Sequence, residues 1–280
     1  MKVSFQNHSL DFSRKTHLMG ILNVTPDSFS DGGRYLGRQE AIDRALRMLD
    51  EGADIIDIGG ESTRPGDDEI PLDEELRRTV PVIEFLSRRV TVPISIDTYK
   101  AGVARSAIEA GASIVNDISV LRFDPEMAPT IAGYDVGLIV MHIKGTPKNM
   151  QKDPHYHDLF GEIRDYLSGS IAIAKGHGIS EDKIIIDPGI GFGKTPENNL
   201  RIIRGLQTLS ELGRPILVGP SRKSFIGLIL NGAAPAGRLE GTAAAVAISV
   251  FNGANIVRVH DVKEMVRVVQ VADAIKNERI

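Results

Sequence analysis

The chain contains no cysteine, which is the most restrictive feature of its composition. Disulfides and thiolate metal sites are therefore excluded, and a cytoplasmic location fits a chain without disulfides. No segment approaches the roughly 20 consecutive apolar residues of a membrane-spanning helix. The first 15 residues include no apolar stretch of signal-peptide length. The sequence therefore predicts a protein that neither spans a membrane nor carries a secretory signal.

The sequence also lacks a basic tract or a basic patch interleaved with aromatic residues, and its net charge is -4. Nucleic acid is therefore not an expected partner. Apolar residues make up 42% of the chain and charged residues 25%, which is ordinary for a soluble globular protein. At 280 residues the chain is long enough for one large α/β unit, so we expect a single domain over residues 1–280.

What is present, from His17 onward, is an alternation of short apolar runs with stretches of helical spacing. Eight runs have the composition of buried strands: 18–24, 55–59, 93–97, 113–117, 136–142, 184–187, 215–219 and 255–260. Eight such βα units predict a (β/α)8 barrel, or TIM barrel, because right-handed crossovers leave essentially one topology. A doubly wound open sheet is the competing interpretation.

A short alternating pattern precedes the predicted barrel. Apolar and polar residues alternate in Val3–Phe5 and again in Leu10–Phe12, on either side of Asn-His-Ser at 7–9. This pattern predicts an N-terminal β-hairpin within residues 1–15. We expect the hairpin to cap one end of the barrel.

Polar side chains gather at one end of the predicted strands. The carboxyl ends of the eight runs carry Asn23, Asp57, Asp97, Asn116, Asp117, His142, Asp187, Ser221, Arg258 and His260. In a (β/α)8 barrel these ends form the rim on which binding and catalytic sites are built. The asymmetry therefore favours an enzyme or a ligand-binding barrel over a purely structural one.

The most informative stretch is IIIDPGIGFGKT at residues 184–195. Three isoleucines precede Asp187, so a fully buried strand ends at a carboxylate and opens into a glycine-rich loop. A carboxylate buried without a partner is costly, so a ligand with donor groups is one natural partner. A structural salt bridge or a turn cap is the alternative. The stretch is not a phosphate-binding P-loop, because Pro188 stands where that loop needs glycine.

Two polar loops follow the first and second strands. Asn23–Gly33 combines acids, glycines and Phe29, which is typical of a substrate lid, although a series of surface turns has the same composition. Residues 59–66, GGESTRPG, present Arg64, which can clamp an anion or remain a solvated loop residue.

A third segment, GPSRKSF at 219–225, follows the seventh run and opens the next predicted helix. Two cations, two hydroxyl groups and free backbone N–H groups there favour an anionic or carbonyl-bearing ligand. We expect Asn23, Arg258 and His260 as its neighbours, forming a candidate anion or magnesium-diphosphate site. An arginine paired to a structural acid is the alternative. His-Tyr-His at 155–157 has no acid at ligand spacing, so we expect a solvated loop there.

Taken together, seven segments resemble the dihydropteroate synthase family of the folate pathway. They are ILNVTPDSFSDGG, GGESTRPG, PISIDT, VNDIS, DPGIGFGKT, GPSRKSF and VRVHDV, and they span almost the whole chain in order. The resemblance implies a pterin-binding TIM barrel that joins p-aminobenzoate to 6-hydroxymethyl-7,8-dihydropterin diphosphate. The implied products are 7,8-dihydropteroate and diphosphate, and sulfonamides would compete for the p-aminobenzoate position.

The resemblance also implies roles for individual residues. The implied pterin site consists of Asp97, Asn116, Met141, Asp187, Phe192, Gly219 and Lys223. The implied diphosphate site consists of Asn23, Arg258 and His260, with Mg2+ as cofactor and Asn23 as its ligand. The implied p-aminobenzoate pocket consists of Phe29, Thr63, Arg64, Pro65 and Ser224.

The implied chemistry is a displacement with dissociative character, in which diphosphate leaves first and a cation develops at the pterin methylene. The implied catalytic residues are Asp31, Asp97, Lys223 and Arg258. By this resemblance Arg258 and magnesium stabilise the departing charge, and Asp97 stabilises the cation. Lys223 donates to the pterin carbonyl side, and Asp31 holds the closed state that screens the cation from water.

Two other interpretations share part of this pattern. A methyltetrahydrofolate-dependent corrinoid methyltransferase domain has the barrel and a pterin slot, but Arg258, His260 and residues 219–225 favour the synthase. A non-catalytic pterin-binding paralogue would lose the loop chemistry, whereas both loops are complete here. Residues 242–251 form an alanine- and valine-rich helix that fits either the barrel's core or a subunit interface, and the resemblance favours a homodimer.

Overall fold

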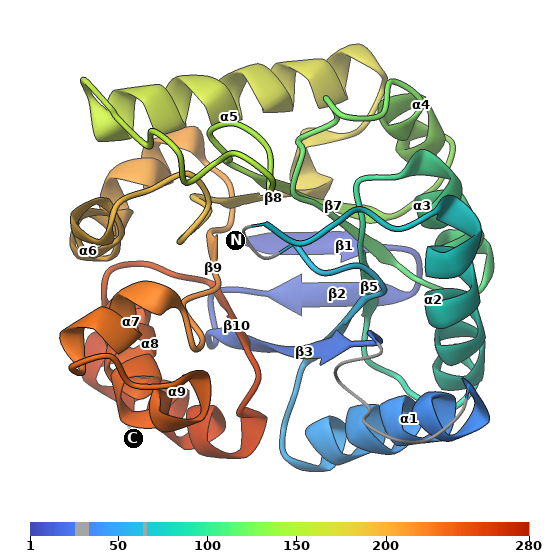
Figure 1. Ribbon diagram of the computed structural model, residues 1–280, viewed down its shortest axis with the longest axis horizontal. Coiled ribbons are helices and arrows are strands. Elements are labelled where there is room, and N and C mark those ends of the chain that lie inside the picture. Colours follow the sequence, from blue (N-terminus) through green and yellow to red (C-terminus); the bar gives the residue numbers. More distant parts are fainter. Residues whose placement is uncertain (26–33, 64–65, 280) are drawn as a thin grey trace.

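The protein is described by a computed structural model that covers residues 1–25, 34–63 and 66–279, with no side chains described for residues 34–36. Within these ranges no helix is long and apolar enough to cross a membrane. Nine α-helices among the described residues form a ring around the strands (Figure 1). They are α1 (Arg34–Asp50), α2 (Leu72–Ser87), α3 (Ala101–Glu109), α4 (Met127–Ala132), α5 (Leu159–Gly176), α6 (Pro196–Arg204), α7 (Ser224–Ile229), α8 (Leu239–Phe251) and α9 (Val262–Asn277). Three short 3-10 helices also lie in the described ranges: η2 (Glu181–Lys183), η3 (Leu206–Leu212) and η4 (Pro235–Gly237).

Inside this ring, eight parallel strands in the described residues lie in the order β8-β7-β6-β5-β4-β3-β10-β9. They are β3 (His17–Asn23), β4 (Ile55–Gly59), β5 (Ile94–Asp97), β6 (Ile114–Asp117), β7 (Gly137–Met141), β8 (Ile184–Asp187), β9 (Leu217–Val218) and β10 (Ile256–Val259). Ile186 bridges Ile216 and its N–H donates to Pro215 O at 2.9 Å, so β8 also meets β9. The result is a nearly closed barrel, which confirms the (β/α)8 prediction over the open doubly wound sheet.

Each barrel strand divides its side chains between two apolar cores, because successive residues point to opposite faces. Outward residues such as Ile56, Ile58, Ile94 and Ile96 pack with the helices in one large buried cluster. Inward apolar residues form a second cluster, made of Met19, Ile55, Ile114, Ile139, Ile185, Leu217 and Ile256. This second cluster occupies the amino-end half of the barrel interior.

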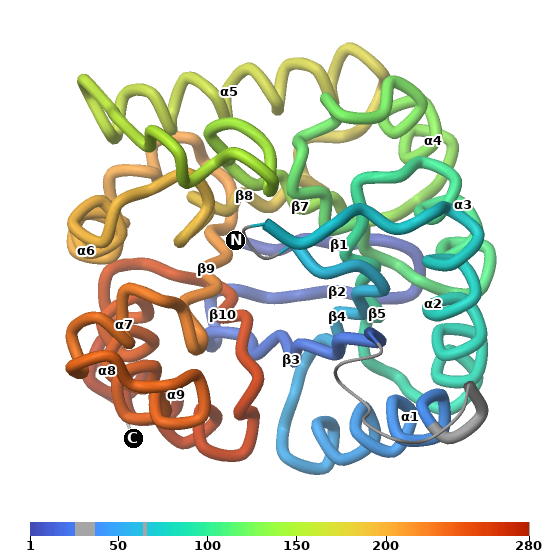
Figure 2. The backbone as a smooth tube through the Cα atoms, viewed as in Figure 1, coloured from blue at the N-terminus to red at the C-terminus, as the bar shows by residue number. Residues whose placement is uncertain are grey.

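The N-terminal hairpin closes that amino end. Strands β1 (Lys2–Phe5) and β2 (His8–Asp11) pair antiparallel and lie across the centre of the view in Figure 2. Their apolar residues Val3, Phe5, Leu10 and Phe12 are buried in the inner cluster. The predicted hairpin and its capping role are therefore confirmed. The turn consists of residues 6–7, so the expected turn at residues 7–9 was placed too late.

The hairpin fixes which end of the barrel can bind a ligand. Because apolar side chains fill the amino end, only the carboxyl ends of the strands leave inward positions for polar groups. The helices that return the chain to the amino end contribute mainly apolar packing against the outer strand faces. A site inside this barrel must therefore open at the carboxyl-end mouth.

Candidate active site

Inward positions become polar toward the carboxyl ends of the strands, where the sequence predicted the site. The parallel register sets Asn23 beside Gly59, Gly59 beside Asp97, and Asp97 beside Asn116. Met141 and Asp187 are likewise register partners on β7 and β8. Because these residues alternate with outward-facing ones, the same periodicity that buries the isoleucines directs them into the mouth.

At the centre of the mouth, Arg258 lies between two carboxylates. Its Nε donates to Asp57 Oδ2 at 2.5 Å, and its Nη2 donates to Asp97 Oδ2 at 2.6 Å. Asn116 Nδ2 donates to the same Asp57 oxygen at 3.2 Å. Burial alone would lower the pKa of Arg258, but the two carboxylates outweigh it and raise that pKa, so the guanidinium stays charged.

The two acids are not fully satisfied by this arginine. Oδ1 of Asp57 and Oδ1 of Asp97 are buried and accept no hydrogen bond from any residue that the structure describes. A buried acceptor without a donor costs about 1–3 kcal/mol. Burial raises the pKa of Asp97, and the nearby Arg258 offsets this only in part. The mouth is thus short of hydrogen-bond donors, which a ligand with N–H groups would supply.

Asp187 lies on the β8 side of the mouth and is buried. Its Oδ1 accepts a hydrogen bond from Gly189 N at 2.7 Å, so the expected alternative of a turn cap holds for one of its two oxygens. Burial raises the pKa of Asp187 to about 6, although the Gly189 N–H and Lys223 act to lower it. At neutral pH the carboxylate is therefore ionised but poorly solvated.

The glycine-rich loop after Asp187 lies flat against the end of β7. A Cβ on Gly189, which has φ +69°, would stand 2.0 Å from His142 O, and one on Gly193, at φ +63°, would stand 2.5 Å from Lys144 O. Only glycine combines this conformation with such close backbone approach. The turn aims the Phe192 ring toward the mouth, where Met141 belongs to the same apolar cluster.

Lys223 crosses the mouth from the loop after β9. Its Nζ lies 4.2 Å from the centre of the Phe192 ring. Burial and the neighbouring Arg258 lower its pKa to about 8, while Asp187 and Asp97 act to raise it. The preceding residue, Arg222, adopts the left-handed conformation at φ 57° and donates from Nε to Asp261 Oδ2 at 3.0 Å. This anchored turn directs Lys223 inward and starts α7 at Ser224.

His260 closes the β10 side of the mouth. Its Nδ1 lies 3.0 Å from Ser221 Oγ, and its backbone oxygen accepts from Arg44 Nη2 at 2.7 Å. Burial, followed by the charges of Arg258 and Arg222, lowers its pKa to about 3. The imidazole is therefore neutral at physiological pH, so the cationic character of this part of the mouth comes from the arginine and from Lys223.

The predicted site residues fall into two groups. Those at the mouth or on its loops are Asn23, Thr63, Asp97, Asn116, Met141, Asp187, Phe192, Gly219, Lys223, Ser224, Arg258 and His260. Those outside the described residues are Phe29, Asp31, Arg64 and Pro65. One strand-end acid, Asp117, faces away from the mouth: its carboxylate accepts from Ser119 N at 2.7 Å and Leu121 N at 2.6 Å.

Asp57 is the residue whose importance the sequence did not reveal. It is fully buried and binds both Arg258 and Asn116, although it only attracted notice as one strand-end acid among several. The available signal was its position in IIDIG, two residues before the strand ends and on the inward face. Its role is to hold the Arg258 side chain in place by accepting a hydrogen bond from its Nε.

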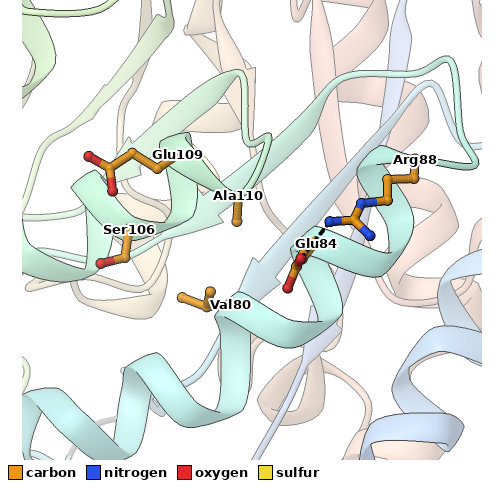
Figure 3. A pocket seen from close by; sticks show the side chains of 6 residues that line it. All are labelled: Val80, Glu84, Arg88, Ser106, Glu109 and Ala110. Carbon is orange, nitrogen blue, oxygen red and sulfur yellow. Dashed lines mark hydrogen bonds and ion pairs between the residues drawn. The ribbon is translucent and has the colours of Figure 1, made fainter.

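A hollow of about 450 Å3 lies on the outer surface between α2 and α3 (Figure 3). It is lined by Val80, Glu84, Arg88, Ser106, Glu109 and Ala110. Glu84 on α2 forms an ion pair at 2.6 Å with Arg88, the residue after the helix. The lining belongs to the carboxyl-terminal halves of both helices and the residue that follows each, where the chain has returned toward the amino end of the barrel. The hollow is therefore remote from the mouth.

Comparison with known proteins identifies the class of this barrel. The profile of a family described as pterin binding enzyme matches residues 19–260. A dihydropteroate synthase of Synechocystis sp. is 50% identical over 265 residues, which cover 95% of this chain and 92% of that relative. The structure of Yersinia pestis dihydropteroate synthase with a sulfonamide drug complex has a TM-score of 0.93 at 43% identity, covering 100% of both chains. That of Xanthomonas albilineans dihydropteroate synthase in complex with 7,8-dihydropteroate has a TM-score of 0.86 at 36% identity, covering 98% of both.

The barrel and its polar mouth are those of a pterin-binding enzyme, and the chain belongs to this family. Relatives at 45 to 50% identity from Synechocystis sp., Bacillus subtilis and Escherichia coli are dihydropteroate synthases. The family resemblance drawn from the seven sequence segments is therefore confirmed.

The close approach of the glycine loop to β7 generates a stability prediction. We expect Gly189→Ala to lower the free energy of unfolding by more than about 3 kcal/mol, the sum of an overpacking cost and the cost of a left-handed backbone. The overpacking arises because the new Cβ would meet His142 O. Gly178→Ala is the matched control, because Gly178 has φ +89° but no atom within 4 Å of its Cβ. It should cost only about 1–2 kcal/mol. Equal losses in urea unfolding would contradict the packing argument.

Proposed function

We propose that this chain catalyses the dihydropteroate synthase reaction at the carboxyl-end mouth of its barrel. The observation that carries the proposal is the presence, in one mouth, of two carboxylates that each keep one oxygen without a donor, beside a partly buried arginine and a partly buried lysine. A pterin diphosphate combines N–H donors on a flat ring with an anionic leaving group, and so complements both parts. The relatives that share the fold at 45 to 50% identity support the same reaction.

In this proposal the pterin ring lies between apolar and acidic groups. Asp187 accepts hydrogen bonds from the amino group and ring N–H of the pterin, a paired arrangement that a carboxylate makes well when water is excluded. Asn116 and Asp97 bind the other ring edge, and Lys223 donates to the ring carbonyl side. Met141 and Phe192, which share one apolar cluster, form the walls of a slot for a flat heterocycle.

The diphosphate is proposed to bind on the Arg258 side with magnesium. The described residues contain no group of three His, Asp or Glu side chains arranged as a metal site. Mg2+ in such enzymes is held by substrate phosphates with one or two protein oxygens, so the Asn23 amide oxygen at the end of β3 fits as a partner. When bound, magnesium would neutralise charge on the departing diphosphate. Gly219, beside the Arg258 side chain, leaves room for the anion.

The chain's own residues then stabilise charge during bond breaking. Arg258 keeps its proton because its pKa is raised, so it offers a fixed positive charge to the leaving group. Asp97 offers a carboxylate to the cation that develops on the pterin. Both groups are held in place before the reaction by their mutual hydrogen bond of 2.6 Å, so little reorganisation is needed.

The p-aminobenzoate pocket is proposed on the rim formed by the loops after β4 and β9. Thr63 and Ser224 contribute from the described residues, with Ser224 exposed at the first residue of α7. Phe29, Arg64 and Pro65 are the proposed remainder, and Asp31 is the proposed residue that closes the first loop.

A direct assay tests the function. The purified protein, supplied with 6-hydroxymethyl-7,8-dihydropterin diphosphate, p-aminobenzoate and Mg2+, should form 7,8-dihydropteroate and release diphosphate in equal amounts. Chelation of magnesium should suppress turnover. Pterin binding without turnover under these conditions would identify a non-catalytic pterin-binding protein instead.

The raised pKa of Asp187 generates a pH prediction. Only the ionised carboxylate accepts both pterin hydrogen bonds, so the dissociation constant for pterin should rise as the pH falls below about 6. Asp187→Asn should weaken binding about 10- to 100-fold, the scale of one lost charged hydrogen bond, and should remove this pH dependence. Titration calorimetry between about pH 5 and 8, a range that begins above the ordinary aspartate pKa of about 4, checks both predictions.

The unliganded stability of the same variant serves as its folding control. Because burial raises the pKa of Asp187 above its ordinary value of 3.8, ionisation costs stability as the pH rises from about 4 through 6. Asp187→Asn should therefore be at least as stable as the wild type at pH 7.5, a pH above that window. A variant that unfolds more easily there, or that binds pterin normally, would contradict the assignment.

We also propose that the chain forms a homodimer through α6, α7 and α8, which lie together on one side of the barrel (Figures 1 and 2). Exposed apolar side chains gather there: Leu200 46%, Leu228 63%, Ile229 58%, Ile248 50% and Phe251 58%. The other face of α8 is buried against the core. The helix at 242–251 thus serves the core on one face and presents apolar groups on the other, as an interface requires.

Introducing negative charge into this apolar surface tests the dimer. Ile248→Glu combined with Phe251→Glu should shift the mass measured by light scattering from twice 30.4 kDa to 30.4 kDa, because two carboxylates cannot be buried between apolar faces. Leu72→Glu, at an exposed apolar residue on α2, is the control and should leave the mass unchanged. A monomeric wild type would contradict the proposal.

A further inference from the structure

The glycine-rich loop between β8 and α6 is held by side chains that reach its backbone oxygens. The carbonyl groups of three successive residues, 191–193, each accept a hydrogen bond from a different side chain. Gln151 Nε2 donates to Gly191 O at 2.6 Å, Lys194 Nζ to Phe192 O at 3.0 Å, and Tyr156 OH to Gly193 O at 2.7 Å. From the other side, Gly191 N donates to Asn199 Oδ1 at 2.7 Å. The loop is therefore fixed at every residue around Phe192.

Two of the three donors come from the segment between β7 and α5, residues 142–158. The segment has its own anchors: Lys144 Nζ donates to His155 O and, at 3.0 Å, to Glu162 Oε2 at the first turn of α5. Tyr156 is half-buried, so the solvated loop expected at 155–157 is only partly right. Met150 is buried against Met141 in the apolar cluster that includes Phe192. This segment thus forms an outer wall for the glycine loop.

The third donor, Lys194, joins the loop to the end of β7. Its buried ammonium faces three acceptors, His142 Nδ1 at 2.9 Å, Phe192 O at 3.0 Å and His142 O at 3.4 Å. An ammonium carries three N–H donors, so this set can satisfy all of them. Burial lowers the pKa of His142 to about 2, which keeps its ring neutral and able to accept at Nδ1.

The exposure of Gln151 shows that its hydrogen bond is not needed to satisfy a buried polar group. Gln151 is exposed, and its partner Gly191 is half-exposed, so water can replace this hydrogen bond at little cost in stability. Ordering a glutamine side chain costs up to about 2 kcal/mol of rotamer entropy. What the bond does fix is the position of residue 191, where a Cβ would stand only 3.2 Å from Lys223 Cδ.

We infer that Gln151 and Tyr156 are positioning residues of the pterin site, which hold the glycine loop so that Phe192 keeps its place as a wall of the slot and its contact with Lys223 Nζ. The inference rests on the proposed pterin site. A loop released from these donors samples other conformations, and the substrate must restrict it on binding. The cost then falls on binding of the pterin substrate, whereas the charge-stabilising groups on Arg258 and Asp97 are untouched.

The test uses variants that remove one donor each without a change of size. Gln151→Met and Tyr156→Phe should each raise KM for the pterin diphosphate about fivefold, the scale of one hydrogen bond, with kcat within about twofold. Gln151→Lys restores a donor of sufficient length and should return KM to within about twofold of the wild type. Lys152→Met, at the neighbouring exposed residue, is the matched control and should change neither constant.

Thermal unfolding of the same variants separates positioning from general stability. The inference requires that the melting temperature of Gln151→Met stay close to that of the wild type while KM rises, because water can replace the hydrogen bond that this exposed side chain makes. It is overturned if KM is unchanged in both variants, or if KM rises only together with a loss of melting temperature that Gln151→Lys does not rescue. Asp187→Asn separates failure of the proposed site from failure of the positioning role. If this variant binds pterin normally, the proposed site is wrong. If it loses pterin binding while Gln151→Met and Tyr156→Phe keep the wild-type KM, only the positioning role is wrong.

Discussion

A partly buried arginine between two carboxylates organises the mouth of this barrel. Arg258 donates to Asp57 and Asp97 at 2.5 and 2.6 Å, so one guanidinium serves two acids. Such a set is costly to bury unless its geometry is good and further partners complete it. The oxygens without donors on both acids show what is still lacking. The same arrangement therefore explains why the mouth holds its charges in advance and why it favours a ligand rich in N–H groups.

The rest of the fold makes this arrangement possible because the two ends of each strand have different roles. Toward the amino end, inward residues are apolar and the N-terminal hairpin seals them from water. Toward the carboxyl end, the same inward face presents acids, an amide and the arginine. Stability is thus concentrated in the sealed half and in the outer core against the helices, which allows the other half to keep poorly satisfied polar groups.

Much of this architecture was readable from the sequence because it is periodic. The alternation of apolar runs with helical stretches identified the eight strands and, through their carboxyl ends, placed Asn116, Asp187 and Arg258 on one rim. The contribution of Asp57 was not readable, since an acid near a strand end looks the same whether it binds substrate or supports an arginine. Asp117 shows the opposite case. It ends a strand, yet its carboxylate faces away from the mouth and caps the turn that follows. Contacts of the loops were also hidden: Gln151 and Tyr156 meet the glycine loop across 40 and 37 residues, without any pattern in between.

The central claim is that one mouth binds both the flat ring and the anionic leaving group, with Arg258 responsible for the second. The most direct measurement is calorimetric binding of the bare hydroxymethyl pterin and of its diphosphate ester, with magnesium, to the wild type and to Arg258→Lys. This variant keeps the charge but loses the planar two-donor geometry. The account predicts a much larger loss of affinity for the diphosphate ester than for the bare pterin. Equal losses for the two ligands would contradict it.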